Sequence, residues 1–97
     1  MPTYISLCQW TQKGIENAKQ SPKRLEQAKK LIASKGGAMK AAYLTIGQYD
    51  FVTITEAPND QAFAEAILAI TSGGAIRSET LIAFEESDYK KIMGSLK

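Results

Sequence analysis

Two charged residues at the starts of apolar, β-rich segments, Asp50 and Arg77, are the clearest candidates for chemistry in this chain. A carboxylate in such a place can act as a general acid or base. A guanidinium nearby can hold a substrate carboxylate or a developing enolate. The sequence therefore predicts a small pocket in which Asp50 is the catalytic residue and in which the substrate-binding residues are Trp10, Tyr43, Tyr49, Arg77 and Glu79.

The chain contains no histidine, which removes the usual general base and the commonest metal and haem ligand. Its one cysteine, Cys8, lies in a β-rich segment and has no histidine with which to form a thiolate pair. We therefore expect Cys8 to pack as a small hydrophobic side chain. No metal-ligand pattern is visible among the other residues, so we predict neither a metal nor a cofactor.

The length of 97 residues predicts a single domain spanning 1–97. A composition of 44% hydrophobic and 23% charged residues is that of a globular domain, and it excludes the disordered and disulfide-rich classes. The N-terminal segment has neither the basic stretch nor the apolar core of a signal peptide. No apolar run approaches the ~18 residues of a membrane span. We therefore expect a cytoplasmic protein without a membrane partner.

Charge is distributed unevenly along the chain, which has a net charge of +2. Residues 1–49 carry eight basic and two acidic side chains, whereas residues 50–97 carry four basic and eight acidic ones. The basic residues of segment 23–35 could form a phosphate-binding stripe. No aromatic side chains alternate with them, and a solvated helix face accounts for them more simply. We expect no nucleic-acid partner.

The pattern of apolar residues predicts four strands, over residues 3–9, 38–46, 49–56 and 75–84. Between and after these strands it predicts a short turn capped by Thr11, a helix over 22–34, a helix that begins at 58–60 and ends before Gly73, and a closing helix over 87–96.

Turn and cap residues support these boundaries. Ser21 and Pro22 combine a capping hydroxyl with proline at the first helical position. The glycine pairs at 36–37 and 73–74 supply a left-handed stop after each of the two longer helices. Gly47 and Gln48 suit a two-residue hairpin between the second and third strands.

The elements form two β-α-β units joined by a hairpin, followed by a closing helix. This order is typical of the ferredoxin-like βαββαβ sandwich, an α+β fold whose antiparallel sheet has the strand order 4-1-3-2 and helices on one face. We assign to that face five apolar residues: Ile5, Leu7, Val52, Ile54 and Leu81. Alternation then places Gln9, Asp50, Arg77 and Glu79 there too, so the predicted pocket lies between sheet and helices. A structural Asp50–Arg77 ion pair is the alternative.

Both faces of the predicted sheet are apolar or rich in hydroxyl groups. The first strand places Ile5 and Leu7 on one side and Tyr4, Ser6 and Cys8 on the other. A sheet without a charged face requires a second cover, which another copy of the chain can provide. We predict a homodimer, or a higher even-numbered homo-oligomer, packed sheet to sheet.

Gly47, Tyr49 and Asp50, with Gln48 interposed, resemble the Gly-Tyr-Asp motif for which the GYD-domain family of small bacterial and archaeal proteins is named. The resemblance extends over nearly the whole chain, through the segments 3–7, 10–11, 21–24, 56–58 and 77–81. It implies a ferredoxin-like chain of the dimeric α/β-barrel type. It implies no reaction, because that wider class contains both enzymes and ligand-sensing modules.

The sequence therefore favours a homo-oligomeric domain that binds a small organic molecule, either anionic or aromatic. One hypothesis is a cofactor-free enzyme that transfers a proton or oxygenates this molecule, with Asp50 as its base. The alternative is a non-catalytic ligand-sensing or assembly module in which the motif residues only fix the hairpin and the dimer.

Overall fold

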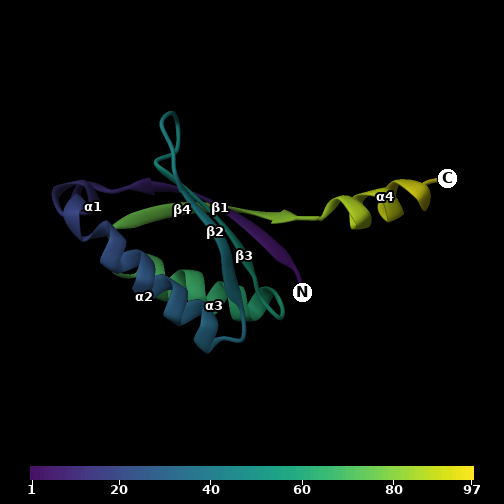
Figure 1. The fold of residues 1–97 in the computed structure, drawn as a ribbon, viewed down its shortest axis with the longest axis horizontal. Coiled ribbons are helices and arrows are strands. Elements are labelled where there is room, and N and C mark those ends of the chain that lie inside the picture. Colours follow the sequence, from purple (N-terminus) through teal and green to yellow (C-terminus); the bar gives the residue numbers. More distant parts are fainter.

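The computed structural model describes residues 1–97 and has the βαββαβ order followed by a closing helix (Figure 1). Its elements, in chain order, are β1 (Thr3–Trp10), α1 (Gln12–Glu16), a 3-10 turn (Ala18–Gln20), α2 (Ser21–Ser34), β2 (Ala38–Leu44), β3 (Phe51–Glu56), α3 (Asp60–Thr71), β4 (Ile76–Ala83) and α4 (Glu86–Gly94).

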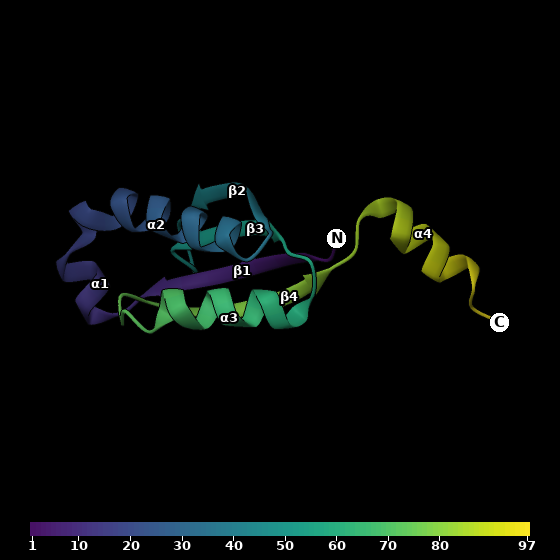
Figure 2. The ribbon, with the colours of Figure 1, turned by 90° about the horizontal axis from the view of Figure 1, so that it is seen from below.

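The four strands form one antiparallel sheet with the order β2-β3-β1-β4, which is the predicted order. Both long helices, α2 and α3, lie on the same face of this sheet, and its other face is open (Figures 1 and 2). The ferredoxin-like α+β fold predicted from the sequence is therefore confirmed.

The helices cover the sheet face that carries Tyr4, Ser6 and Cys8, each of which is at most 4% exposed. Ile5 and Leu7 point to the open face and are only partly buried. The assignment of five apolar residues to the helix-covered face is therefore wrong for Ile5, Leu7, Val52, Ile54 and Leu81. Strand residues alternate between faces, so a shift of one residue in the assignment exchanges the two sets completely.

The packing of α3 on β1 decides which face is covered. The ring of Tyr4 stacks on that of Phe63, with centroids 4.2 Å apart and an interplanar angle of 11°. The Tyr4 hydroxyl donates a hydrogen bond to Asp60, in the first turn of α3. With Ala57, these two aromatic residues form the small buried core at this end of the sheet. Burial, together with the bond to Asp60, raises the pKa of Tyr4 to about 12.

Most helix boundaries have the predicted causes. The Thr11 side chain accepts a hydrogen bond from the Gly14 N–H, and that of Asn59 accepts one from the Ala62 N–H. The predicted cap at Ser21 is wrong, because Ser21 is itself helical and no side chain caps α2. One glycine of each predicted pair has a positive φ angle, Gly36 after α2 and Gly74 after α3, as a left-handed stop requires.

The hairpin between β2 and β3 is longer than the predicted two-residue turn. Its strands pair as far as Leu44 and Phe51, and residues 45–50 connect them. The Thr45 N–H still donates to the Asp50 carbonyl, 2.9 Å away, which closes the loop at its base. Gly47 has a φ of 142°, in the region that glycine favours. Position 47 therefore requires a glycine, although the loop is longer than predicted.

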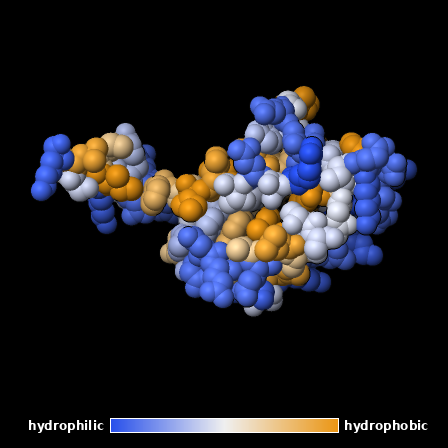
Figure 3. All heavy atoms as spheres, turned by 180° about the vertical axis from the view of Figure 1, so that it is seen from behind, coloured by the Kyte–Doolittle hydropathy of each residue, from blue (hydrophilic) through white to orange (hydrophobic).

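The closing helix α4 projects away from the rest of the molecule, beyond the end of β4 (Figures 1 and 3). Its apolar residues Tyr89, Ile92 and Met93 recur at helical spacing and are exposed, as is Leu96 just after the helix. None of the helices combines the length and apolar character needed to cross a membrane.

Candidate functional site

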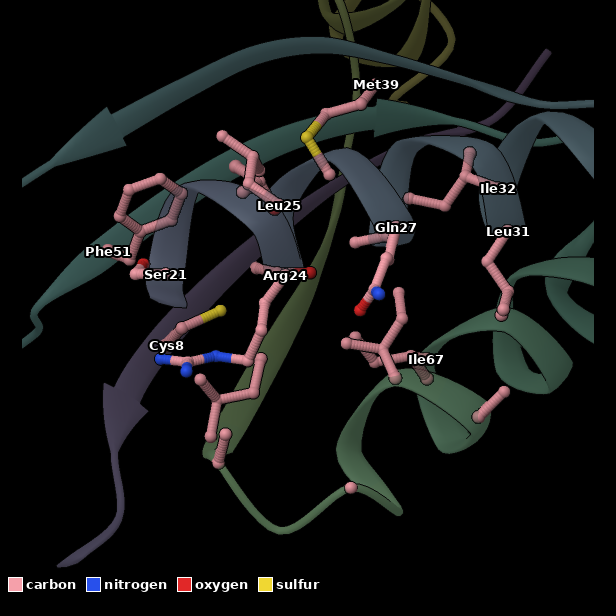
Figure 4. Close-up of a pocket in the computed structure, with 18 of the residues that line it drawn as sticks. Cys8, Ser21, Arg24, Leu25, Gln27, Leu31, Ile32, Met39, Phe51 and Ile67 are labelled. Carbon is pink, nitrogen blue, oxygen red and sulfur yellow. The ribbon is translucent and has the colours of Figure 1, made fainter. Parts of the chain in front are cut away.

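A large cavity, of about 670 Å³, lies between α2, α3 and the covered face of the sheet (Figure 4). Its walls are mainly apolar, and prominent among them are Leu25, Leu31, Met39, Phe51, Ile67 and Ile70. A largely apolar cavity of this size is typical of a site for a small organic molecule.

Small side chains on the sheet account for the space beneath the helices. Ser6, Thr53 and Thr55 are buried on the covered face, where a larger apolar residue would fill the gap. The Ser6 hydroxyl lies 3.3 Å from that of Thr80 on β4, so it has a polar partner within the sheet. The side chains on the sheet side of the cavity are therefore small, and they carry hydroxyl groups.

The charged groups that line the cavity are all basic. They are Lys13, Lys23 and Arg24, and no aspartate or glutamate is among the lining residues. The Lys13 ammonium group donates to the Gly73 carbonyl, 2.9 Å away, and Lys23 is exposed. Arg24 extends from α2 toward the side of the cavity where Cys8 lies (Figure 4).

Arg24 is one of the basic residues of segment 23–35 that the sequence assigned to a solvated helix face, and the structure instead places it at this cavity. Its Nη1 donates to the Asn17 carbonyl at 3.0 Å, whereas its Nη2 is buried and has no hydrogen-bond partner. A signal for it exists in the sequence, because Arg24 lies four and seven residues before Ala28 and Leu31. It therefore occupies a position on the apolar stripe of α2 that an aliphatic residue normally takes.

Cys8 also lines the cavity and is 4% exposed. Its burial raises the pKa of the thiol from 9.0 to about 11. Cys8 is therefore a neutral thiol at physiological pH and not an activated nucleophile, in keeping with the expected packing role.

Asp50, the predicted catalytic residue, is engaged by the backbone of β1. Its Oδ2 accepts a hydrogen bond from the Trp10 N–H at 3.0 Å, and its own N–H donates to the Cys8 carbonyl at 2.9 Å. It makes no ion pair with Arg77, so the structural alternative considered for these two residues is not what the structure shows. Asp50 fastens the end of the hairpin loop to the end of β1.

Three of the other predicted residues meet on the open face of the sheet. The Tyr49 hydroxyl donates to Glu79 Oε2 at 2.8 Å, and this bond raises the pKa of Tyr49. Arg77 Nη2 lies 3.5 Å from Gln9 Oε1, a long hydrogen bond. These residues line a smaller, more polar hollow of about 280 Å³.

The six predicted site residues therefore do not share one pocket. Trp10 lines the large cavity, whereas Tyr49, Arg77 and Glu79 line the hollow on the opposite face. Tyr43 is 57% exposed on β2 and borders neither. The placing of Gln9, Arg77 and Glu79 between sheet and helices is wrong, because all three line the hollow on the open face.

No group of three cysteine, aspartate or glutamate side chains lies close enough together to hold a metal ion. The large cavity is therefore the better candidate for a binding site. It can hold an apolar molecule, and the buried Nη2 of Arg24 can donate a hydrogen bond to a polar group of that molecule.

Comparison with known proteins identifies the family. The GYD domain matches this chain over residues 4–93. The "Glutamine synthetase and cystathionine beta-lyase binding protein" of Thermus thermophilus is 34% identical to it over 89 residues, which cover 91% of this chain and 94% of that protein.

Among solved structures, a hypothetical protein from Pyrococcus horikoshii has a TM-score of 0.57 and 25% identity, over 89% of this chain and 93% of its own. A feast or famine regulatory protein from M. tuberculosis, in complex with L-methionine, has a TM-score of 0.66 at 13% identity. That match covers 88% of this chain but 51% of the regulator, so the chain spans about half the regulator's length. The regulator therefore shows a shared fold, and the match over residues 4–93 shows that the chain belongs to the GYD-domain family.

Proposed function

We propose that this protein is a homo-oligomeric, ligand-sensing domain that binds one small organic molecule per protomer in the large cavity. The observation that carries the proposal is the mainly apolar cavity of about 670 Å³ between the helices and the sheet. It is partly open to solvent, and an apolar recess of this size is a favourable site for a small organic molecule.

The chemistry of the cavity wall supports binding over catalysis. The wall has no carboxylate, and its one thiol has a pKa of about 11. The predicted base, Asp50, holds the backbone of β1 and is not among the lining residues. A cofactor-free enzyme with Asp50 as base is therefore the less favoured hypothesis, since the base would lie outside the site that encloses the substrate.

The homo-oligomer is proposed from the open face of the sheet. Ile5, Leu7, Val52 and Ile54 are only partly buried there, and Leu81 is 46% exposed. Removing this apolar surface from water would stabilise an assembly in which two sheets pack together. A homodimer, or a higher even-numbered homo-oligomer, is therefore the expected state.

A second candidate function is the binding of an enzyme partner. The Thermus thermophilus relative is named as a binding protein for glutamine synthetase and cystathionine β-lyase, and it matches nearly the whole of this chain. The projecting helix α4, with its exposed apolar residues, is a surface that a protein partner could cover. Interferometry with the full chain and the two purified enzymes tests this function, and an absence of binding would remove it.

The test of the principal proposal uses N-phenyl-1-naphthylamine, a neutral apolar dye that fluoresces when it leaves water. We expect saturable binding of about one dye per protomer. Replacing Ala66, which is 2% exposed and lines the cavity, by phenylalanine fills part of that space and is expected to weaken binding by about tenfold or more.

Ala64→Phe is the matched control, because Ala64 lies on the same helix but is exposed and does not line the cavity. It is expected to leave the dye affinity within about twofold of the wild type. A wild-type protein that does not bind the dye, or equal weakening by the two substitutions, contradicts the proposal. Far-UV circular dichroism shows whether each variant is folded.

A further inference from the structure

We propose that the ligand of the large cavity is a small organic carboxylate, whose charged group pairs with Arg24 and whose aliphatic or aromatic body packs between α2 and α3. This inference rests on the proposed function, since it names the class of molecule that the cavity would hold. It is carried by the geometry of Arg24 and by the charges around it.

Arg24 is only partly satisfied within the protein. Its Nη1 donates to the Asn17 carbonyl at 3.0 Å, and its Nη2 is buried without a partner. A buried donor without a partner is unfavourable, and a charged one more so. A carboxylate oxygen placed at Nη2 would remove this cost, because guanidinium and carboxylate groups form strong charge-assisted hydrogen bonds.

No carboxylate of the protein itself lines the cavity and could pair with Arg24 in place of a ligand. The charged lining residues of the cavity are Lys13, Lys23 and Arg24, and none of the lining residues is acidic. Arg24 also takes part in none of the ion pairs of the structure. An anionic ligand is therefore the complement that this site lacks.

The walls limit how much charge the ligand can carry. Apart from Arg24, the surroundings of the cavity are mainly apolar, and Lys13 is bonded to the Gly73 carbonyl. A second negative charge, as on a phosphate monoester, would have to be buried against apolar side chains at a high cost. A single carboxylate on an apolar body fits both parts of the site.

The experiment measures how a matched pair of ligands displaces the bound dye. The pair is 4-phenylbutanoate and 4-phenylbutanamide, which have the same body and differ in the charge of the end group. We expect the wild type to prefer the carboxylate by about tenfold or more. Arg24→Gln should remove this preference and leave the affinity for the amide within about twofold.

Lys29→Gln is the control, because Lys29 is a cation on the same helix that pairs with Glu26 and does not line the cavity. It should leave both affinities unchanged. Equal affinities of the wild type for the two ligands would overturn the carboxylate proposal. Equal weakening of both ligands by Arg24→Gln would overturn it as well. In either case dye binding by the wild type would still support the cavity as a site, whereas its absence refutes the proposed function itself.

A second measurement needs no variant. Cys8 is the one cysteine of the chain and lines the same cavity, so its alkylation by iodoacetamide reports occupancy. The reaction is run at pH 9, because the buried thiol is largely protonated at neutral pH. At equal concentration the carboxylate should slow this alkylation more than the amide does. Equal protection by the two ligands would count against the pairing with Arg24, whatever the variants show.

Discussion

Tyr4 joins the sheet to α3 through its stacking on Phe63 and its hydrogen bond to Asp60. Its pKa is about 12 in the folded chain, and a tyrosine in an unfolded chain titrates near 10. Between these values the unfolded state loses a proton that the folded state keeps. The free energy of unfolding is therefore expected to fall as the pH rises from about 10 to about 12.

Urea unfolding followed by circular dichroism at several pH values measures this effect. Tyr4→Phe should lower the free energy of unfolding by about 1 kcal/mol at pH 7, because the bond to Asp60 is lost. It should also flatten the decline above pH 10. Tyr43→Phe is the control, because Tyr43 is 57% exposed. A decline above pH 10 that is the same in Tyr4→Phe and in the wild type would show that Tyr4 is not its source.

At the scale of elements, the close approach of α1 to the start of β4 depends on a glycine. A Cβ at position 14 would lie 2.0 Å from the Ala75 carbonyl oxygen, which also accepts a hydrogen bond from the Thr11 N–H. Local propensity gives no reason to expect this contact, since a glycine in a short helix only weakens that helix. Its function is to let two backbones touch.

Gly14→Ala is therefore expected to lower the free energy of unfolding by about 2–3 kcal/mol, because α1 must move away from β4. Gly94→Ala provides the comparison: a Cβ there meets nothing within 4 Å. Its effect should stay within about 0.5 kcal/mol. Urea denaturation measures the free energy of unfolding of the two variants. Equal values would show that the close approach of α1 to Ala75 does not depend on the glycine.

At the scale of the whole molecule, the open sheet face is expected to set the oligomeric state. Leu81 and Ile82 are adjacent on β4, point to opposite faces and are 46% and 58% exposed. Leu81→Lys should raise the dissociation constant of the homo-oligomer by about 100-fold or more, since a charge would be buried between the sheets. Ile82→Lys should leave it nearly unchanged.

Sedimentation velocity over a range of concentrations measures both variants and the wild type. A wild type that stays monomeric at high concentration would refute sheet-to-sheet assembly. Dissociation by Ile82→Lys and not by Leu81→Lys would place the interface on the other side of β4. Denaturant unfolding of each variant separates loss of assembly from loss of the fold.

The sequence by itself determined the order of the elements and their topology. Thr11, Asn59 and the glycines after α2 and α3 act on their immediate neighbours, so their effect can be deduced from local propensities. Two β-α-β units with a hairpin between them then leave few ways to arrange the strands. The family resemblance, carried by Gly47, Tyr49 and Asp50, is confirmed by the match over residues 4–93.

Only the tertiary structure decided which face of the sheet the helices cover, and with it which residues share a site. Alternation divides the residues of β1 into two sets that point to opposite faces of the sheet. Because neither set is charged, the sequence does not indicate which face the helices cover. In the structure, Tyr4 packs on Phe63 of α3, so the face that carries Tyr4 is the covered one. This arrangement separated Trp10 from Arg77 and enclosed Arg24 with Cys8. The volume of a cavity depends on how side chains from elements far apart in the sequence pack against one another. No local sequence pattern predicts that volume.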